Sequence, residues 1–98
     1  MPTPIPPDAT VCWNPDHLAS EVDNQIVLMS ISEGKYIGLD EIASVVWRRL
    51  DHPVRVTALC EDLIRDYQGD AAEIARDVNK LLEELDGLGL LVIERATN

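Results

Sequence analysis

The segment GKYIGLDEIASVVWRRL, residues 34–50, decides the fold because it passes from a strand to a helix without a linker. Residues 35–39 are a short, mostly apolar run behind Gly34, which is typical of a strand that leaves a tight turn. Asp40 is a good N-cap residue, and the apolar residues after it recur at helical spacing. The helix must stop before Pro53, because proline disfavours the helical conformation in the residue preceding it. The segment therefore predicts a strand followed directly by a helix.

The residues before this segment indicate further strands. Residues 10–13 form a short extended run, and residues 14–19 form a polar link. Residues 21–31 then contain side chains that alternate with the period of a half-buried strand. Residues 32–35 have turn chemistry and join this run to the strand at 35–39, so the two form a β-hairpin. We expect them to be the middle and edge strands of a three-stranded antiparallel sheet.

Two more helices are indicated downstream. Residues 56–67 have apolar side chains at helical spacing, although Arg55 is a poor N-cap. Residues 70–73 resemble a capping box and open a third helix, which ends at Gly87 or Gly89. The apolar stripe of this third helix consists of Ile74, Val78, Leu81, Leu82, Leu85 and Leu88. The fold class is therefore α+β and winged-helix-like, with a three-stranded antiparallel sheet followed by three helices.

Length and composition bound the class of protein. The chain has 98 residues, of which 46% are hydrophobic, which suffices for one globular domain with a small core. We expect a flexible proline-rich arm at residues 1–9, a domain at 10–93 and a tail at 94–98. The apolar residues 90–93 are expected to add a final short strand. No apolar run is long enough to span a membrane and no secretory signal opens the chain, which predicts a cytoplasmic protein.

The charge of the chain is strongly acidic. Eighteen Asp and Glu residues against eight Lys and Arg residues give a net charge of -10. Such a field repels nucleic-acid phosphates and anionic membranes; it suits a partner bearing Lys or Arg, or serves solubility alone. Winged helices often bind DNA, but the second and third expected helices are both net acidic, which opposes phosphate contact. A DNA-binding regulator is therefore an alternative that the charge disfavours.

Residues able to perform chemistry are sparse. His17 and His52 have no second histidine or cysteine at metal-ligand spacing, and Cys12 and Cys60 form no CxxC pair. Cys60 falls on the apolar stripe of the second helix, which indicates a buried thiol. No serine stands in a nucleophile elbow, and no glycines form a phosphate-binding loop. We therefore expect no enzyme activity, no metal and no cofactor.

The order of motifs around the first helix resembles the PqqD family. That family's hairpin typically reads Gly-basic-Tyr-x-x-Leu-Asn/Asp and leads into a helix with a Trp near its middle. Residues 77–90 are similar to the family's third helix and its ending, and the resemblance spans about residues 25–92. Glu41 and Ile42 depart from the small or polar residues common there, and Arg55 replaces a frequent Thr cap. The residues that match are Gly34, Lys35, Tyr36, Leu39, Asp40, Ala43, Trp47, Arg48, Arg49 and Leu50.

The resemblance implies a domain that binds peptide. Members of this family are RiPP recognition elements (RiPP: ribosomally made, post-translationally modified peptide). In them the leader of a precursor peptide adds as a strand to the edge of the sheet, and its side chains enter a groove beside the third helix. An exposed edge strand suits this role because its N–H and C=O groups are unpaired. The implied peptide-binding residues are Lys35, Tyr36, Ile37, Gly38, Leu39, Ile74, Asp77, Val78, Leu81, Leu82 and Leu85.

Some of these assignments have an open alternative. Any apolar residue of the third helix either lines the groove or belongs to the core, as such a stripe normally does. Asp77 either meets a leader Lys or Arg or is a solvated charge. Trp47 is expected in the core, whereas Trp13 either caps the sheet or faces a partner.

The resemblance also implies partner proteins. Stand-alone family members serve lasso-peptide synthesis, where they deliver the precursor to a leader peptidase and a cyclase, or pyrroloquinoline quinone synthesis, with a radical enzyme. The apolar strand at residues 27–31, and Asp40 where the quinone-pathway proteins tend to have Asn, favour the lasso group. Two further alternatives are a docking adaptor without peptide affinity and a homodimer formed through the exposed edge strand.

Overall fold

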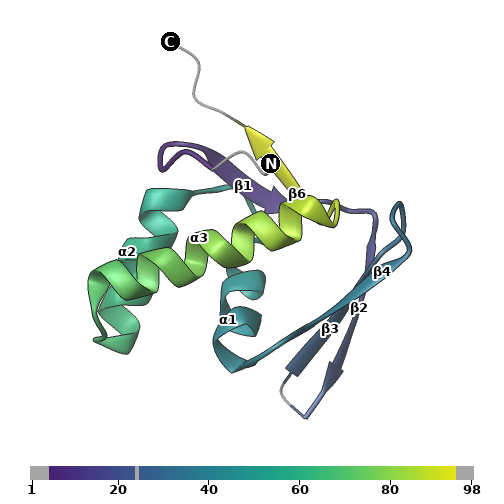
Figure 1. The fold of residues 1–98 in the computed structure, drawn as a ribbon, viewed down its shortest axis with the longest axis horizontal. Coiled ribbons are helices and arrows are strands. Elements are labelled where there is room, and N and C mark those ends of the chain that lie inside the picture. Colours follow the sequence, from purple (N-terminus) through teal and green to yellow (C-terminus); the bar gives the residue numbers. More distant parts are fainter. Residues whose placement is uncertain (1–4, 24, 95–98) are drawn as a thin grey trace.

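The computed structural model describes residues 5–23 and 25–94. The described residues form two small sheets and three helices, arranged as shown in Figure 1. The expected α+β class, with a three-stranded antiparallel sheet and three helices, is confirmed. The elements in chain order are β1 Thr10–Trp13, β2 His17–Val22, β3 Gln25–Ser30, β4 Lys35–Leu39, α1 Glu41–Arg49, β5 Val54–Arg55, α2 Val56–Tyr67, α3 Ala71–Gly87 and β6 Leu91–Glu94.

The strands divide into two antiparallel sheets with the orders β2-β3-β4 and β5-β1-β6. The hairpin of β3 and β4 forms as expected, but its third strand is β2 and not the strand at residues 10–13, which pairs with β6 in the other sheet. The expected link at residues 14–19 and the single run at 21–31 are therefore wrong. Asp23, with a φ of 51°, turns the chain between β2 and β3, a conformation that Asp tolerates better than most residues.

The helices begin where their caps predict. The Asp40 carboxylate accepts a hydrogen bond of 2.8 Å from the N–H of Ala43, and the Asp70 carboxylate accepts one of 3.1 Å from the N–H of Glu73. These bonds satisfy N–H groups that have no partner within the helix. Gly89, which follows α3, has a φ of +74° and lets the chain turn into β6.

Residues 5–9 pack against the domain, which differs from the flexible arm expected at residues 1–9. The side chain of Ile5 is 5% exposed. The carbonyl of Pro7 accepts hydrogen bonds from the N–H and the hydroxyl of Thr57, and the carbonyl of Ala9 accepts one from the N–H of Val56. These carbonyls supply the partners that α2 lacks at its N-terminus, where Arg55 makes no side-chain cap. Residues 1–4 of the expected arm, and residues 95–98 of the expected tail, lie outside the described residues.

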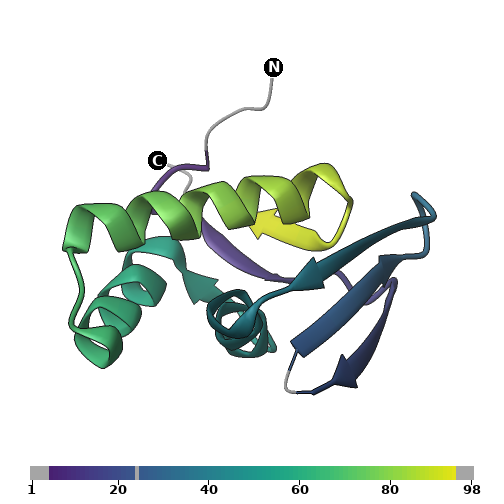
Figure 2. The ribbon, with the colours of Figure 1, turned by 60° about the horizontal axis from the view of Figure 1, so that its bottom comes forward.

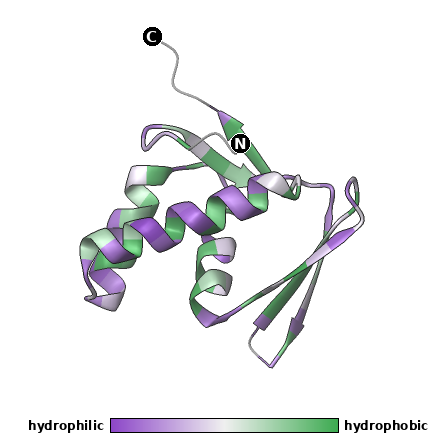
Figure 3. Ribbon diagram, viewed as in Figure 1, coloured by the Kyte–Doolittle hydropathy of each residue, from purple (hydrophilic) through white to green (hydrophobic). Residues whose placement is uncertain are grey.

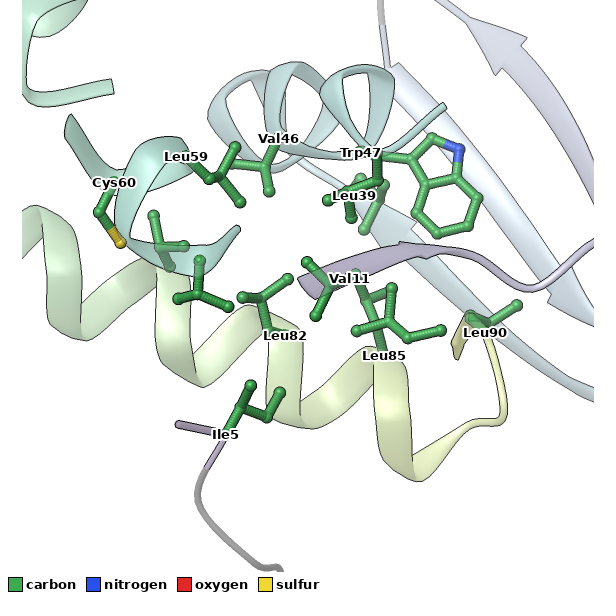
Figure 4. Close-up of a cluster of buried hydrophobic side chains, with 14 of the residues drawn as sticks. Ile5, Val11, Leu39, Val46, Trp47, Leu59, Cys60, Leu82, Leu85 and Leu90 are labelled. Atoms are coloured by element: carbon green, nitrogen blue, oxygen red, sulfur yellow. The ribbon is translucent and has the colours of Figure 1, made fainter. Parts of the chain in front are cut away.

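One aliphatic core joins both sheets to the helices, as the close-up in Figure 4 shows. Trp47 is buried in it, and the expected burial of Cys60 is also confirmed. The rings of Trp13 and Trp47 are stacked with centroids 5.1 Å apart, and the Nε1–H of Trp13 donates to the Trp47 carbonyl at 2.6 Å. Trp13 therefore fastens β1 to α1. Figure 2 shows that α3 runs above α1 and α2, so it is a common wall for the rest of the domain.

Candidate functional site

The strand β4 is an edge of its sheet, because β3 pairs with it on one side only. Its backbone therefore offers N–H and C=O groups to a further strand on the other side. Ile37 is half-buried and Leu39 is buried, so these side chains point towards the helices. Tyr36 and Gly38 alternate with them and are exposed on the opposite face.

A groove of about 420 Å³ lies between this edge and the helices. Leu39 and Val46 are buried in its floor, while Ile37, Ile74 and Leu81 are half-buried and accessible from it. Figure 1 shows how β4, α1 and α3 surround this region. The residues that line the groove are Ile37, Gly38, Leu39, Asp40, Ile42, Ala43, Val46, Leu63, Tyr67, Ile74, Asp77, Val78, Lys80, Leu81 and Glu84.

The structure brings most of the residues expected at the site together around this groove and places the others elsewhere. Leu82 and Leu85 are fully buried in the core. Lys35 and Tyr36 lie on β4 but do not line the groove, and the Tyr36 side chain is 71% exposed. The expected residues that do line it are Ile37, Gly38, Leu39, Ile74, Asp77, Val78 and Leu81.

The first two helices contribute a wall that the sequence did not indicate. Ile42 and Ala43 come from the first turn of α1, and Leu63 and Tyr67 come from the last turns of α2. Ile42 is 56% exposed and Tyr67 is 44% exposed, so both side chains offer apolar surface at the groove. An apolar residue just after an N-cap was a usable signal, but its neighbours come from two other helices and depend on the tertiary fold.

The charged residues at the groove are mostly acidic. Asp40, Asp77 and Glu84 contribute carboxylates, and Lys80 contributes the ammonium group. Asp40 is engaged as the N-cap of α1, which leaves Asp77 and Glu84, both exposed, on the α3 side. These charges favour a ligand that has a cation next to an apolar group.

Buried polar contacts fix the walls of the groove. The Ser44 hydroxyl is buried; it donates to the carbonyl of Leu39 and accepts from the N–H of Ile26, both at 3.3 Å. This serine ties α1 to the edge strand and to its neighbour. Outside the groove, the Asn14 amide donates to the carbonyl of Gly89 at 3.0 Å and joins the link between β1 and β2 to the turn between α3 and β6. These contacts join separate elements directly, so the groove is formed before any ligand binds.

The sequence matches one known protein family, described as coenzyme PQQ synthesis protein D (PqqD), over residues 25–91. The chain belongs to the PqqD family. The expected resemblance over about residues 25–92 is thereby confirmed.

Two solved structures share the PqqD-family fold of this chain. One is TbiB1 in complex with the TbiA(beta) leader peptide, with 23% identity, a TM-score of 0.72, and coverage of 89% of this chain and 99% of that one. The other is lasso peptide synthetase B1 complexed with the leader peptide, with 21% identity, a TM-score of 0.69, and coverage of 84% and 96%. No curated protein matches the chain.

The remaining reactive groups of this PqqD-family chain lie outside the groove. His17 packs edge-on against Trp13 and Trp47, and His52 is exposed beside Asp51. Burial, with a smaller effect of the Glu61 carboxylate, raises the pKa of the Cys60 thiol. In residues 5–23 and 25–94, no three His, Cys, Asp or Glu side chains are grouped to hold a metal ion. No helix in the same ranges is long and apolar enough to cross a membrane.

Proposed function

We propose that this chain is a non-catalytic carrier that binds the leader segment of a ribosomally made precursor peptide by strand addition to β4. The observation that supports this most directly is an open strand edge beside a preformed, largely apolar groove. Main-chain hydrogen bonds give affinity with little demand on sequence, and pockets for alternate side chains give specificity. Two solved structures with a similar fold contain a bound leader peptide, which is consistent with this role.

The leader would lie along β4 with every second side chain directed into the groove. An aliphatic or aromatic leader residue would rest between Ile37, Ile42 and Leu81, which offer apolar surface from three elements. A leader Lys or Arg would lie near Asp77 or Glu84. Both carboxylates are exposed, so this pairing would adjust affinity modestly and would weaken with salt.

The carrier would present its peptide in the cytoplasm to a leader peptidase and a cyclase of a lasso-peptide pathway. The description of the family, coenzyme PQQ synthesis, favours a second candidate, namely delivery of a precursor to a radical enzyme. The neighbouring genes distinguish the two. A short precursor gene beside a transglutaminase-like protease and an asparagine-synthetase-like cyclase indicates the lasso pathway, and a radical enzyme indicates the other.

The decisive experiment is a fluorescence-anisotropy titration with the labelled leader half of the neighbouring precursor. We expect micromolar or tighter binding, and a loss of at least tenfold in Leu81→Asp, which places a charge in the groove. Val92→Asp is the matched control, because Val92 is 42% exposed on β6 and does not line the groove. N-methylation of successive peptide amides should weaken binding at every second position, since only alternate N–H groups of an added strand face β4.

One outcome would refute the carrier function. If the folded protein fails to bind the leader at high concentration, the carrier function is refuted and the docking-adaptor alternative is favoured. That alternative predicts a stable complex with an enzyme in the absence of peptide. Circular dichroism of each variant separates lost binding from lost folding.

A further inference from the structure

Among the described residues of β2, β3 and β4, no charged side chain lies on the outer face of their sheet. The strand register places alternate residues of the three strands on this face, pointing away from the helices. On a chain in which 27% of residues are charged, a solvent-facing sheet surface would ordinarily include several charges. The residues of this outer face are Leu18, Ser20, Val22, Gln25, Val27, Met29, Tyr36 and Gly38.

Several of these side chains are large, apolar and exposed. Leu18 is 58% exposed, Val22 is 59% exposed and Tyr36 is 71% exposed. In the register, Leu18, Met29 and Tyr36 form one row across all three strands. Figure 3 shows hydrophobic and hydrophilic residues mixed along the strands of this sheet, which lies on the side of the molecule away from α2. Tyr and Met with few charges are the composition of a protein-binding surface.

A leader added to β4 would enlarge this face. A fourth strand directs half of its side chains into the groove and the other half onto the outer face, next to Tyr36 and Gly38. Gly38 leaves open space there, because a Cβ atom built on it would meet no atom within 4 Å. The outer face and the outward half of the leader would then form one continuous surface.

We infer that this composite face docks the enzyme that modifies the precursor, and that the loaded carrier is docked more tightly than the empty one. The inference rests on the proposed function, since it requires the leader to lie on β4. The enzyme surface that fits has an apolar centre surrounded by Lys and Arg. The complementary charges on this chain are the exposed carboxylates of Asp16, Asp23 and Glu33, which lie just before β2 and in the two turns of the sheet.

A second copy of this chain fits the face poorly. In a dimer formed through this face, the acidic edges of the two copies would lie against each other, and each copy has a net charge of -10, so the copies would repel. The face is also small. Three strands spaced about 4.8 Å apart, each about five residues long with a rise of about 3.4 Å per residue, give a planar area of about 240 Å². A stable interface buries about 800 Å² on each partner. A transient enzyme contact that the leader strand extends is consistent with this size, whereas a permanent dimer is not.

The test uses the full chain, the labelled leader peptide and the purified precursor-modifying enzyme encoded beside it. Leu18→Thr/Val22→Thr removes apolar surface from β2, two strands away from β4, and retains β-branched residues suited to a strand. We expect this double variant to bind the leader within twofold of the wild type and to bind the enzyme at least tenfold more weakly. Val92→Thr, which removes exposed apolar surface from one side chain on β6, should leave both affinities unchanged.

The leader should strengthen docking in the wild type. Saturating leader should raise enzyme affinity at least threefold, and polar substitutions at outward-facing leader positions should remove that gain without weakening leader binding.

Enzyme binding by the double variant equal to that of the wild type would overturn the inference while leaving the carrier function intact. A leader that fails to bind the wild type would refute both. The inference would also be overturned if the leader did not change the affinity for the enzyme. It would be overturned as well if sedimentation showed a wild-type dimer that the double variant does not form.

Discussion

Two adjacent leucines of α3 should separate peptide binding from stability. Leu81 is half-buried and lines the groove, whereas Leu82 is fully buried in the core. Truncating each to alanine removes the same atoms from neighbouring positions of one helix. We therefore expect Leu81→Ala to impair peptide binding and Leu82→Ala to impair folding.

The burial of each side chain sets the size of the effect. Leu82→Ala loses the full transfer free energy and leaves a cavity, which costs about 3 kcal/mol or more. Leu81→Ala leaves space that opens to the groove, so its cost is about 1 kcal/mol of unfolding free energy, roughly half the transfer value of a fully buried leucine. The lost contact with the leader should be of similar size, about 1–1.4 kcal/mol, which corresponds to a five- to tenfold weaker affinity.

Urea unfolding followed by tryptophan fluorescence measures the stabilities, because Trp13 and Trp47 stack between β1 and α1 and report on both. Leader anisotropy measures affinity under conditions where each variant is folded. If Leu82→Ala does not fold, Leu82→Val makes the same comparison with a smaller loss. Equal destabilisation by Leu81→Ala and Leu82→Ala, with unchanged leader affinity in Leu81→Ala, would show that the groove assignment is wrong.

Three further predictions follow from the geometry. Asp77→Lys should weaken the binding of a leader that has Lys or Arg opposite residue 77 by about two- to fivefold, and the difference in affinity should vanish in high salt. A loss of affinity that is independent of salt would contradict an ionic role for Asp77. Gly89→Ala should lower the unfolding free energy by about 1–2 kcal/mol, because Gly89 has a φ of +74° and a Cβ atom there would lie 3.2 Å from the Ser32 hydroxyl; urea unfolding tests this, with Gly38→Ala, which has open space, as the control. Burial raises the pKa of the Cys60 thiol above the usual 9.0, so the folded state retains this proton longer than the unfolded state, and the associated stability is present below about pH 9 and lost as pH rises through the folded pKa. Urea unfolding between about pH 8 and pH 10 should show an alkaline decline that is smaller in Cys60→Ala, and parallel declines would contradict the shift.

The helices were predictable because their signals are local. The N-caps Asp40 and Asp70 bond to N–H groups three residues away, and the apolar periodicity of α2 gives its limits at Val56 and Tyr67. A signal that lies within one turn of the chain does not depend on the rest of the fold.

The strand β2 was missed because its outward face is the more apolar one. Leu18 and Val22 point to solvent, while Ala19 and Glu21 share the side of the sheet that faces the helices. This reverses the pattern by which a half-buried strand is recognised. The same reversal produces the uncharged outer face, so the failure of the pattern coincides with the surface for which we infer a partner.

The packing of residues 5–9 was hidden for a different reason. Proline-rich segments without periodicity usually indicate flexible chain. The contacts that hold this one join Pro7 to Thr57, fifty residues apart in the sequence. Only the tertiary fold shows that carbonyl groups of the proline segment accept hydrogen bonds from the N-terminus of α2, which lacks a side-chain cap.

The candidate groove was half predictable, and the arrangement of α3 explains which half. Its core stripe is Val78, Leu82 and Leu85, and these residues are all buried. A second stripe of groove-lining residues runs beside it at spacings of three and four residues: Ile74, Asp77, Leu81 and Glu84. Successive residues of a helix are about 100° apart, so this second stripe is centred roughly a quarter turn from the first.

When the apolar stripe of an amphipathic helix is wider than the part that packs into the core, the remaining apolar surface is available to a ligand. On α3 the excess consists of Ile74 and Leu81, and the carboxylates of Asp77 and Glu84 alternate with them along the same stripe. A peptide lying along this helix would therefore meet apolar and acidic positions in turn, about one helical turn apart. The leader that fits has large apolar residues interspersed with basic ones, and a leader in which acidic residues replace the basic ones should bind this groove more weakly than one with neutral residues.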